Sequence, residues 1–184
     1  MGGMRKSLER VANLFIYKIT IMIVYRTDSR DPNTIQNARG FYARQPMSIV
    51  NARRHLLDFC TAPQSPLDLS RLIIGSPQPN YVSTDPKTDC GGYDKGFFYQ
   101  ISVDNLEEKD WSAAVLGIAN NLLVKPIWPK LFLNADTLAD ATIIALKHYG
   151  NPTKEVTFLT EIPLLNIIAY KSSKDKDFVL MPLN

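Results

Sequence analysis

The chain has 184 residues, of which 45% are hydrophobic and 21% charged, and its formal net charge at pH 7 is +3. A chain of this length and composition can bury a core without disulfide bonds. A charge this small, on scattered basic residues, is not the electrostatic footprint of a nucleic-acid-binding protein. With two cysteines and two histidines, the sequence has no cluster spaced like a metal site. We therefore expect one domain that needs no metal.

Residues 1–18 precede that domain, which we expect to span 19–184. Basic residues near the start, followed by an apolar run over 11–24, resemble the first two parts of a secretory signal. However, Lys18 interrupts the run, and no small-residue cleavage motif precedes Tyr25. We interpret 1–18 as an extension that leads into the first strand, with a signal-like segment as the alternative. The run is too short and too interrupted to span a membrane.

The apolar run Ile21–Val24 leads into a polar stretch, Tyr25-Arg26-Thr27-Asp28-Ser29-Arg30-Asp31-Pro32. The alternation predicts a buried strand that delivers Arg26 to a pocket, followed by a polar turn that ends at Pro32. Because a guanidinium keeps its charge, Arg26 requires an anionic partner there. The alternative interpretation is an ordinary cluster of surface salt bridges.

The rest of the chain predicts helices mixed with short strands. We expect helices over 46–59, 112–124 and 136–149, strands at 81–84, 96–105, 155–160 and 167–170, and loops over 63–79 and 86–95. The expected buried face of the first helix consists of Ile49, Val50, Leu56 and Leu57. Because the elements follow no βαβ rhythm, the sequence favours an α+β fold, a split β-sandwich with flanking helices.

Three segments, in order along the chain, resemble the motifs of cholera- and pertussis-like mono-ADP-ribosyltransferase toxins. The string YR-x-DSR-x-P, with Gly40-Phe41 after it, resembles the first motif of that family. Tyr81-Val82-Ser83-Thr84 resembles its aromatic-x-Ser-Thr-Ser strand, although Asp85 stands in place of the last serine. Glu155, with Ile162-Pro163 following at the family's spacing, resembles the segment of the catalytic glutamate. The long helix that these toxins have after the second motif is replaced here by the short loop 86–95.

The resemblance implies an ADP-ribosyltransferase-like fold that binds NAD as a substrate and needs no metal. It makes Glu155 the catalytic carboxylate, Ser83 the residue that orients it, and Arg26 the residue that holds the NAD cleft together near the phosphates. The remaining residues that it implies for NAD binding are Asp28, Ser29, Arg30, His55 and Thr84.

The residues before Glu155 bear on the acceptor of the ADP-ribose. Members of the family that modify arginine carry a second glutamate two positions before the catalytic one, where this chain has Thr153. A threonine cannot act as a carboxylate base, so arginine is disfavoured as the acceptor. Tyr149 is our candidate for contact with the target, and His148 is interpreted as a residue at the end of a helix.

The function implied is that of a secreted or delivered toxin or effector that transfers ADP-ribose to a target protein. A binding subunit or an immunity protein would be a further partner. Two alternatives remain at this point: a relative that modifies a nucleic-acid base, which the scattered basic charge disfavours, and a non-catalytic relative that binds NAD or a partner. Two free thiols are the default expectation for Cys60 and Cys90, and a Cys60–Cys90 bridge is the alternative if the protein is exported.

Overall fold

The computed structural model describes residues 22–61, 81–93, 95–117, 129–147 and 155–182, except for the side chains of 58–61. Several expectations concern positions outside the described residues: the N-terminal segment 1–18, the loop 63–79, the Cys60 side chain, His148, Tyr149 and Thr153. Cys90 is a free thiol.

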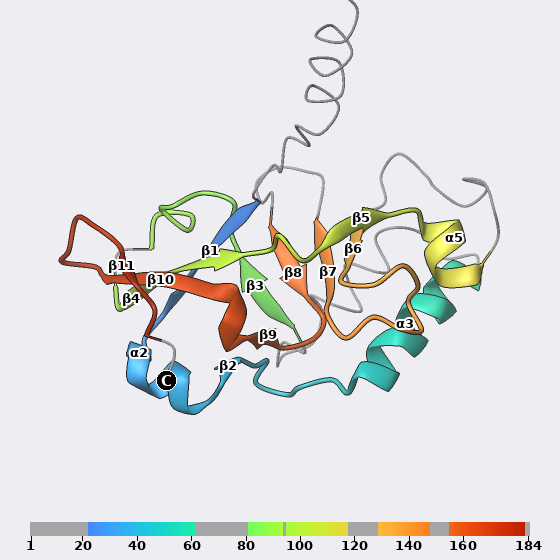
Figure 1. Ribbon diagram of the computed structural model, residues 1–184, viewed down its shortest axis with the longest axis horizontal. Coiled ribbons are helices and arrows are strands. Elements are labelled where there is room, and N and C mark those ends of the chain that lie inside the picture. Colours follow the sequence, from blue (N-terminus) through green and yellow to red (C-terminus); the bar gives the residue numbers. More distant parts are fainter. Residues whose placement is uncertain (1–21, 62–80, 94, 118–128, 148–154, 183–184) are drawn as a thin grey trace, which may run out of the picture.

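The strands of the described residues form antiparallel sheets (Figure 1). In spatial order, the first sheet contains β1 (Ile23–Asp28), β4 (Phe97–Ser102), β10 (Ile167–Ser172) and β11 (Val179–Leu180). The second contains β3 (Val82–Thr84), β8 (Val156–Phe158), β7 (Ile144–Lys147), β6 (Lys130–Leu133) and β5 (Glu107–Lys109). A short pair joins β2 (Gly40–Phe41) to β9 (Ile162–Pro163).

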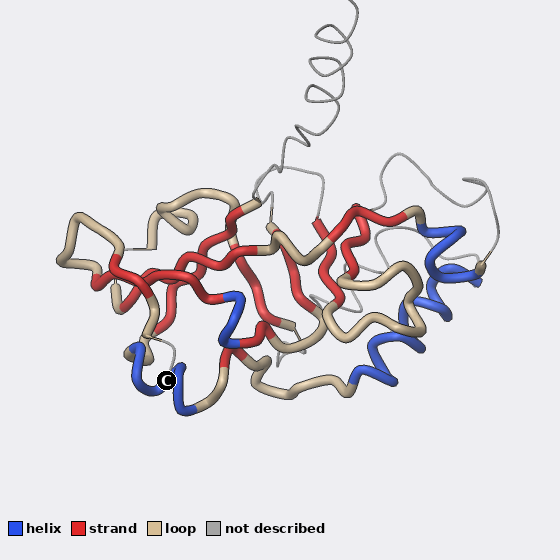
Figure 2. Tube along the Cα trace, viewed as in Figure 1, coloured by secondary structure: helices blue, strands red, loops and turns tan. Residues whose placement is uncertain are grey.

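Short helices flank these sheets: α2 (Pro32–Asn37), α3 (Ile49–Thr61), α5 (Trp111–Leu116) and the 3₁₀ turn η1 (Leu164–Asn166). The Asp31 side chain caps α2 by accepting a hydrogen bond from the backbone N–H of Thr34 at 2.9 Å. Asp110 caps α5 in the same way, and both caps satisfy N–H groups that lack a partner within the helix. Figure 2 shows the strands in the middle of the molecule, with α3 and α5 together at one end.

Two apolar cores hold these layers together. The first lies between the two larger sheets and includes Val24, Tyr99, Ile101, Val82, Val156 and Phe158. The second joins the other face of the five-stranded sheet to α3 and α5 and includes Ala52, Leu56, Trp111, Leu131 and Leu146. Because side chains alternate along a strand, this sheet contributes residues to both cores. The described residues therefore form an α+β arrangement, in which antiparallel sheets predominate and helices are few.

The predicted helix over 136–149 is wrong. A loop occupies its first part, where the Asn134 side chain accepts hydrogen bonds from the backbone N–H groups of Thr142 and Ile143, both at 2.9 Å. Strand β7 then runs between β6 and β8, and Ile144–Leu146 are buried on both faces of the sheet. An apolar run buried on both faces has no alternation, so periodicity cannot distinguish it from a helix.

The other two predicted helices exist with different limits. Helix α5 ends before Gly117, which adopts the left-handed conformation at φ +66°, instead of continuing to 124. In α3, Leu56 is buried as expected and Ile49 is half-buried, but Val50 and Leu57 are exposed. Ala52 and Leu56 are four residues apart, so they lie on the same side of the helix, and this side faces the second core. With the helix in this orientation, the side chains of Val50 and Leu57 face solvent.

The strands predicted around Arg26, Ser83, 96–105, 155–160 and 167–170 are confirmed as β1, β3, β4, β8 and β10. In the loop predicted over 86–95, the described residues 86–93 and 95 form turns and bends and no helix or strand. Within the described part of the chain, no helix is both long enough and apolar enough to cross a membrane.

Candidate functional site

The core-facing side of β1 changes from apolar to charged along its length. Val24 is fully buried in the first core, and Arg26 and Asp28 follow on the same side because successive side chains alternate. The neighbouring strand β4 places Tyr99 directly opposite Arg26, and Tyr99 is also fully buried. The sequence therefore brings a guanidinium to the end of the apolar core, between the two larger sheets.

Arg26 joins these sheets where the pairing of their strands stops. Tyr25 and Asp85 form an isolated bridge, with both N–H···O distances at 2.7 Å. The bridge does not extend to Thr27 and Ser83, and the Nη1 atom of Arg26 instead donates to the carbonyl oxygen of Ser83 at 2.7 Å. The guanidinium therefore satisfies a strand carbonyl that would otherwise lack a partner in the ladder.

Asp28 lies between Arg26 and Arg30. Its Oδ1 accepts from Nε of Arg30 at 2.8 Å and its Oδ2 accepts from Nη2 at 2.8 Å, a two-bond contact, while Arg26 Nη2 lies 3.4 Å from Oδ2. Burial raises the pKa of Asp28, but the hydrogen bonds from Arg30 and the positive charges of Arg26 and Arg30 together outweigh it, so the net pKa lies below its usual value. Phe41 packs under both guanidinium groups, with 5.3 and 5.7 Å from its ring centre to their carbon atoms.

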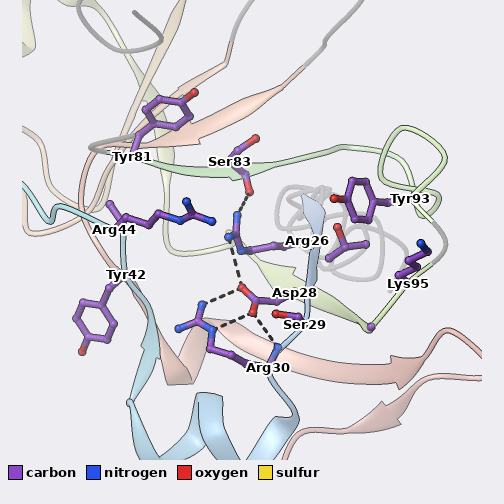
Figure 3. Close-up of a pocket in the computed structure, with 13 residues that line it drawn as sticks. Arg26, Asp28, Ser29, Arg30, Tyr42, Arg44, Tyr81, Ser83, Tyr93 and Lys95 are labelled. Carbon is purple, nitrogen blue, oxygen red and sulfur yellow. Dashed lines mark hydrogen bonds and ion pairs between the residues drawn. The ribbon is translucent and has the colours of Figure 1, made fainter. Parts of the chain in front are cut away.

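A cavity of about 950 Å³ opens beside this cluster (Figure 3). Its lining is Arg26, Thr27, Asp28, Ser29, Arg30, Tyr42, Ala43, Arg44, Tyr81, Ser83, Tyr93, Lys95 and Gly96. Four of these described lining side chains are cationic: Arg26, Arg30, Arg44 and Lys95. Asp28 is the one carboxylate among the described residues of the lining. The Arg44 side chain points toward the guanidinium of Arg26 (Figure 3). Such a wall attracts an anion, because converging guanidinium groups need negative charge between them.

Ser83 and Thr84 point to opposite faces of β3. Ser83 lines the cavity and contacts Arg26 through its backbone carbonyl. Thr84 is 3% exposed and donates a hydrogen bond to the carbonyl oxygen of Val156 at 2.7 Å. Thr84 therefore stabilises the pairing of β3 with β8 and is not among the residues that line the cavity.

Glu155 lies just before β8, the strand that pairs with β3. The register places Thr157 opposite Ser83, and the Thr157 hydroxyl donates to Oε1 of Glu155 at 3.4 Å. Glu155 is not among the cavity-lining residues, but its charge reaches one of them: burial raises the pKa of Tyr81, and the negative charge of Glu155 raises it further. The segments of Arg26, Ser83 and Glu155 therefore lie side by side.

The structure does not bring every expected residue to this cavity. His55 is exposed on α3 and does not line the cavity, because α3 packs into the second core through Ala52 and Leu56 and the His55 side chain lies outside that face of the helix. Asp28, Ser29 and Arg30 do line it, although Asp28 is occupied by the two arginines. Tyr149 and Thr153 lie outside the described residues.

Among the charged and aromatic residues that line the cavity, sequence reasoning missed four that lie outside the recognised motifs: Tyr42, Arg44, Tyr93 and Lys95. Tyr42 and Arg44 directly follow the Gly40-Phe41 pair, and Tyr93 and Lys95 end the loop over 86–95. The only feature of the sequence that could have indicated these four residues is their position next to recognised motifs. No periodicity marks them, because all four lie outside regular helices and strands.

No group of His, Cys, Asp or Glu among the described residues could hold a metal ion. Comparison with known proteins gave no match: no family model matches the sequence, and no curated protein is significantly similar to it.

Proposed function

We propose that this chain is a NAD-dependent mono-ADP-ribosyltransferase, a toxin or effector with an ADP-ribosyltransferase-like split β-sandwich. It cleaves the nicotinamide–ribose bond and transfers ADP-ribose to a target protein, at a residue other than arginine. The observation that supports the proposal is that the segments of Arg26, Ser83 and Glu155 lie side by side, with Arg26 and Ser83 lining the cavity. These residues come from three segments far apart in the sequence, and their strands are neighbours.

The charge of the cavity suits the pyrophosphate of NAD. Asp28 neutralises one of the two positive charges of Arg26 and Arg30. Arg44 and Lys95 each add a positive charge to the lining, so the cavity wall keeps a net positive charge. A pyrophosphate carries two negative charges, and guanidinium groups bind phosphate oxygens through paired hydrogen bonds. The volume of about 950 Å³ is at the upper end of the range for ligand pockets, as a dinucleotide requires.

We assign to Glu155 the catalytic role of stabilising the positive charge that develops on the ribose. When the bond between nicotinamide and ribose breaks, nicotinamide leaves with the bonding electrons and the ribose carbon gains oxocarbenium character. A carboxylate beside the ribose accepts a hydrogen bond from the 2′-hydroxyl and stabilises this positive charge. The acceptor side chain then bonds to the ribose carbon and loses its proton.

The first test measures both half-reactions. The protein is incubated with NAD labelled in its adenosine part, once with lysate protein and once with DNA and RNA, and free nicotinamide is quantified. We expect nicotinamide release with label on protein. Label on nucleic acid would identify the base-modifying alternative. Measurable NAD binding without release or transfer would contradict the proposal and support the non-catalytic alternative.

The second test is Glu155→Gln, which removes the negative charge and keeps the size of the side chain. Losing one preorganised group that stabilises transition-state charge costs about 10²–10³ in rate. We therefore expect nicotinamide release to fall by at least about 100-fold, with an unchanged unfolding temperature. Glu161→Gln is the matched control, because Glu161 is an exposed glutamate on the same segment. Near-normal turnover of Glu155→Gln would refute the assignment.

A further inference from the structure

We propose that Thr157 is the positioning residue for Glu155: its buried hydroxyl holds one oxygen of the carboxylate, so that the other faces the ribose. This inference rests on the proposed function. The sequence resemblance gave this role to Ser83. In the structure, the hydrogen bond to the Glu155 carboxylate comes from Thr157.

The backbone around Thr157 is fixed by pairing on both sides. Strand β8 lies between β3 and β7, and Thr157 lies opposite Ser83 on one side and Leu146 on the other. Its side chain is fully buried at 0% exposure. Glu155 is two residues earlier, so both side chains lie on the same face of the sheet.

Thr157 is suited to orient a flexible glutamate. A β-branched side chain has few rotamers, so its hydroxyl direction is largely fixed once the strand is formed. A buried hydroxyl also needs an acceptor, because leaving it unpaired costs free energy. The hydroxyl therefore restricts the carboxylate of Glu155 through Oε1. The distance of 3.4 Å is long for such a bond, and catalytic hydrogen bonds of this kind tighten when substrate is bound.

The test is a comparison of Thr157→Val and Thr157→Ser, assayed by nicotinamide release from NAD. Valine has the shape of threonine without the hydroxyl, whereas serine keeps the hydroxyl. If Thr157 orients the carboxylate, Thr157→Val lowers kcat about tenfold, a modest loss beside that expected for removing the carboxylate. KM for NAD stays within about twofold, because the cationic wall that binds the phosphates is untouched. Thr157→Ser restores most of kcat.

Thr160→Val is the matched control. Thr160 is also a buried threonine, 8% exposed, but its hydroxyl accepts from the backbone N–H of Ile144 and donates to the carbonyl of Glu161. Loss of the Thr160 hydroxyl in Thr160→Val should lower the unfolding temperature and leave kcat unchanged. If Thr157→Val does not fold, Thr157→Ser and Thr157→Cys replace it, because they differ in one atom and cysteine is a weak donor. The serine variant should then keep kcat and the cysteine variant lose it.

The outcomes separate this inference from the proposed function. A wild-type protein that releases no nicotinamide overturns both. Wild-type release with an inactive Glu155→Gln and a fully active Thr157→Val overturns only the role of Thr157. Equal losses of kcat in Thr157→Val and Thr160→Val would also overturn it, because the effect would then follow from the loss of any buried hydroxyl nearby.

Discussion

Asp28 is the counter-ion on which the cationic cluster depends. Its side chain is 9% exposed and lies against the guanidinium groups of Arg26 and Arg30. Without it, two like charges would face each other beside Phe41. Asp28 therefore acts through the arginines, and we assign it to the support of the cavity wall and not to direct contact with NAD.

The first prediction concerns the substitution Asp28→Asn. The amide keeps the size but loses the charge-assisted hydrogen bonds, and we expect a loss of about 2–3 kcal/mol in the free energy of unfolding at pH 7, measured by urea denaturation. Asp136→Asn is the control. Asp136 accepts a hydrogen bond from Lys109 at 2.8 Å but is 96% exposed, so its loss should leave stability unchanged within error.

The second prediction concerns how pH changes the stability difference between wild type and Asp28→Asn. Folding lowers the pKa of Asp28 below its usual value of about 3.9. Its contribution to stability is therefore complete above that value and is lost as the pH falls through the lowered pKa. The difference in unfolding free energy between wild type and Asp28→Asn should be constant near neutral pH and narrow below about pH 4. A difference that grows on acidification would contradict this role.

At the scale of elements, the turns between β3 and β4 form one side of the cavity. They contribute Tyr93, Lys95 and Gly96 to its lining. Gly96 has φ +80°, and a Cβ there would lie 2.5 Å from the carbonyl oxygen of Asp28. The close approach of this turn to β1 therefore requires glycine, because only glycine lacks the Cβ.

Gly96→Ala should consequently disturb Asp28 as well as its own turn. A left-handed conformation costs an L-residue about 1–2 kcal/mol, and the contact with Asp28 adds to that cost. Gly92→Ala is the matched control, since Gly92 has φ +86° but no atom within 4 Å of its Cβ position. We expect the free energy of unfolding to fall further in Gly96→Ala, and KM for NAD to rise only there. Equal effects of the two substitutions would contradict the importance of the close approach.

At the scale of the whole molecule, the two larger sheets share one core but are joined by few polar contacts at the cavity. The bridge between Tyr25 and Asp85 is one, and the hydrogen bond from Arg26 to Ser83 is the next. The guanidinium spans the gap that opens when the strands stop pairing. Arg26 therefore holds the walls of the cavity together and also faces the cavity.

Arg26→Lys tests this role. An ammonium group is a compact charge and cannot reproduce a planar fork that reaches both Ser83 and Asp28. We expect a loss of about 2 kcal/mol in stability, in the range for hydrogen bonds to charged groups, and faster hydrogen exchange at the backbone N–H groups of Tyr25 and Asp85. Arg44→Lys is the control, since Arg44 is exposed at the cavity wall and should leave both measurements unchanged. Unchanged exchange at the bridge in Arg26→Lys would show that Arg26 does not join the sheets.

The sequence by itself determined the strands that carry Arg26 and Ser83, the strand that directly follows Glu155, and the need of Arg26 for a partner. The physical reason is local: alternation sets which side chains of a strand face the core, and a guanidinium cannot lose its charge. Alternation failed for Ile144–Leu146, since both faces of β7 are buried and no polar residue marks a solvent side.

Only the tertiary structure decided which side chains meet. Pairing of β3 with β8 turned Thr84 toward the first core and placed Thr157 beside Glu155. Packing of α3 on the second core left His55 in solvent, and the connection that leads into α3 brought Arg44 toward Arg26. These contacts depend on strand register and on the fit of two cores. Both are set by interactions between residues far apart in the chain, and no local pattern encodes them.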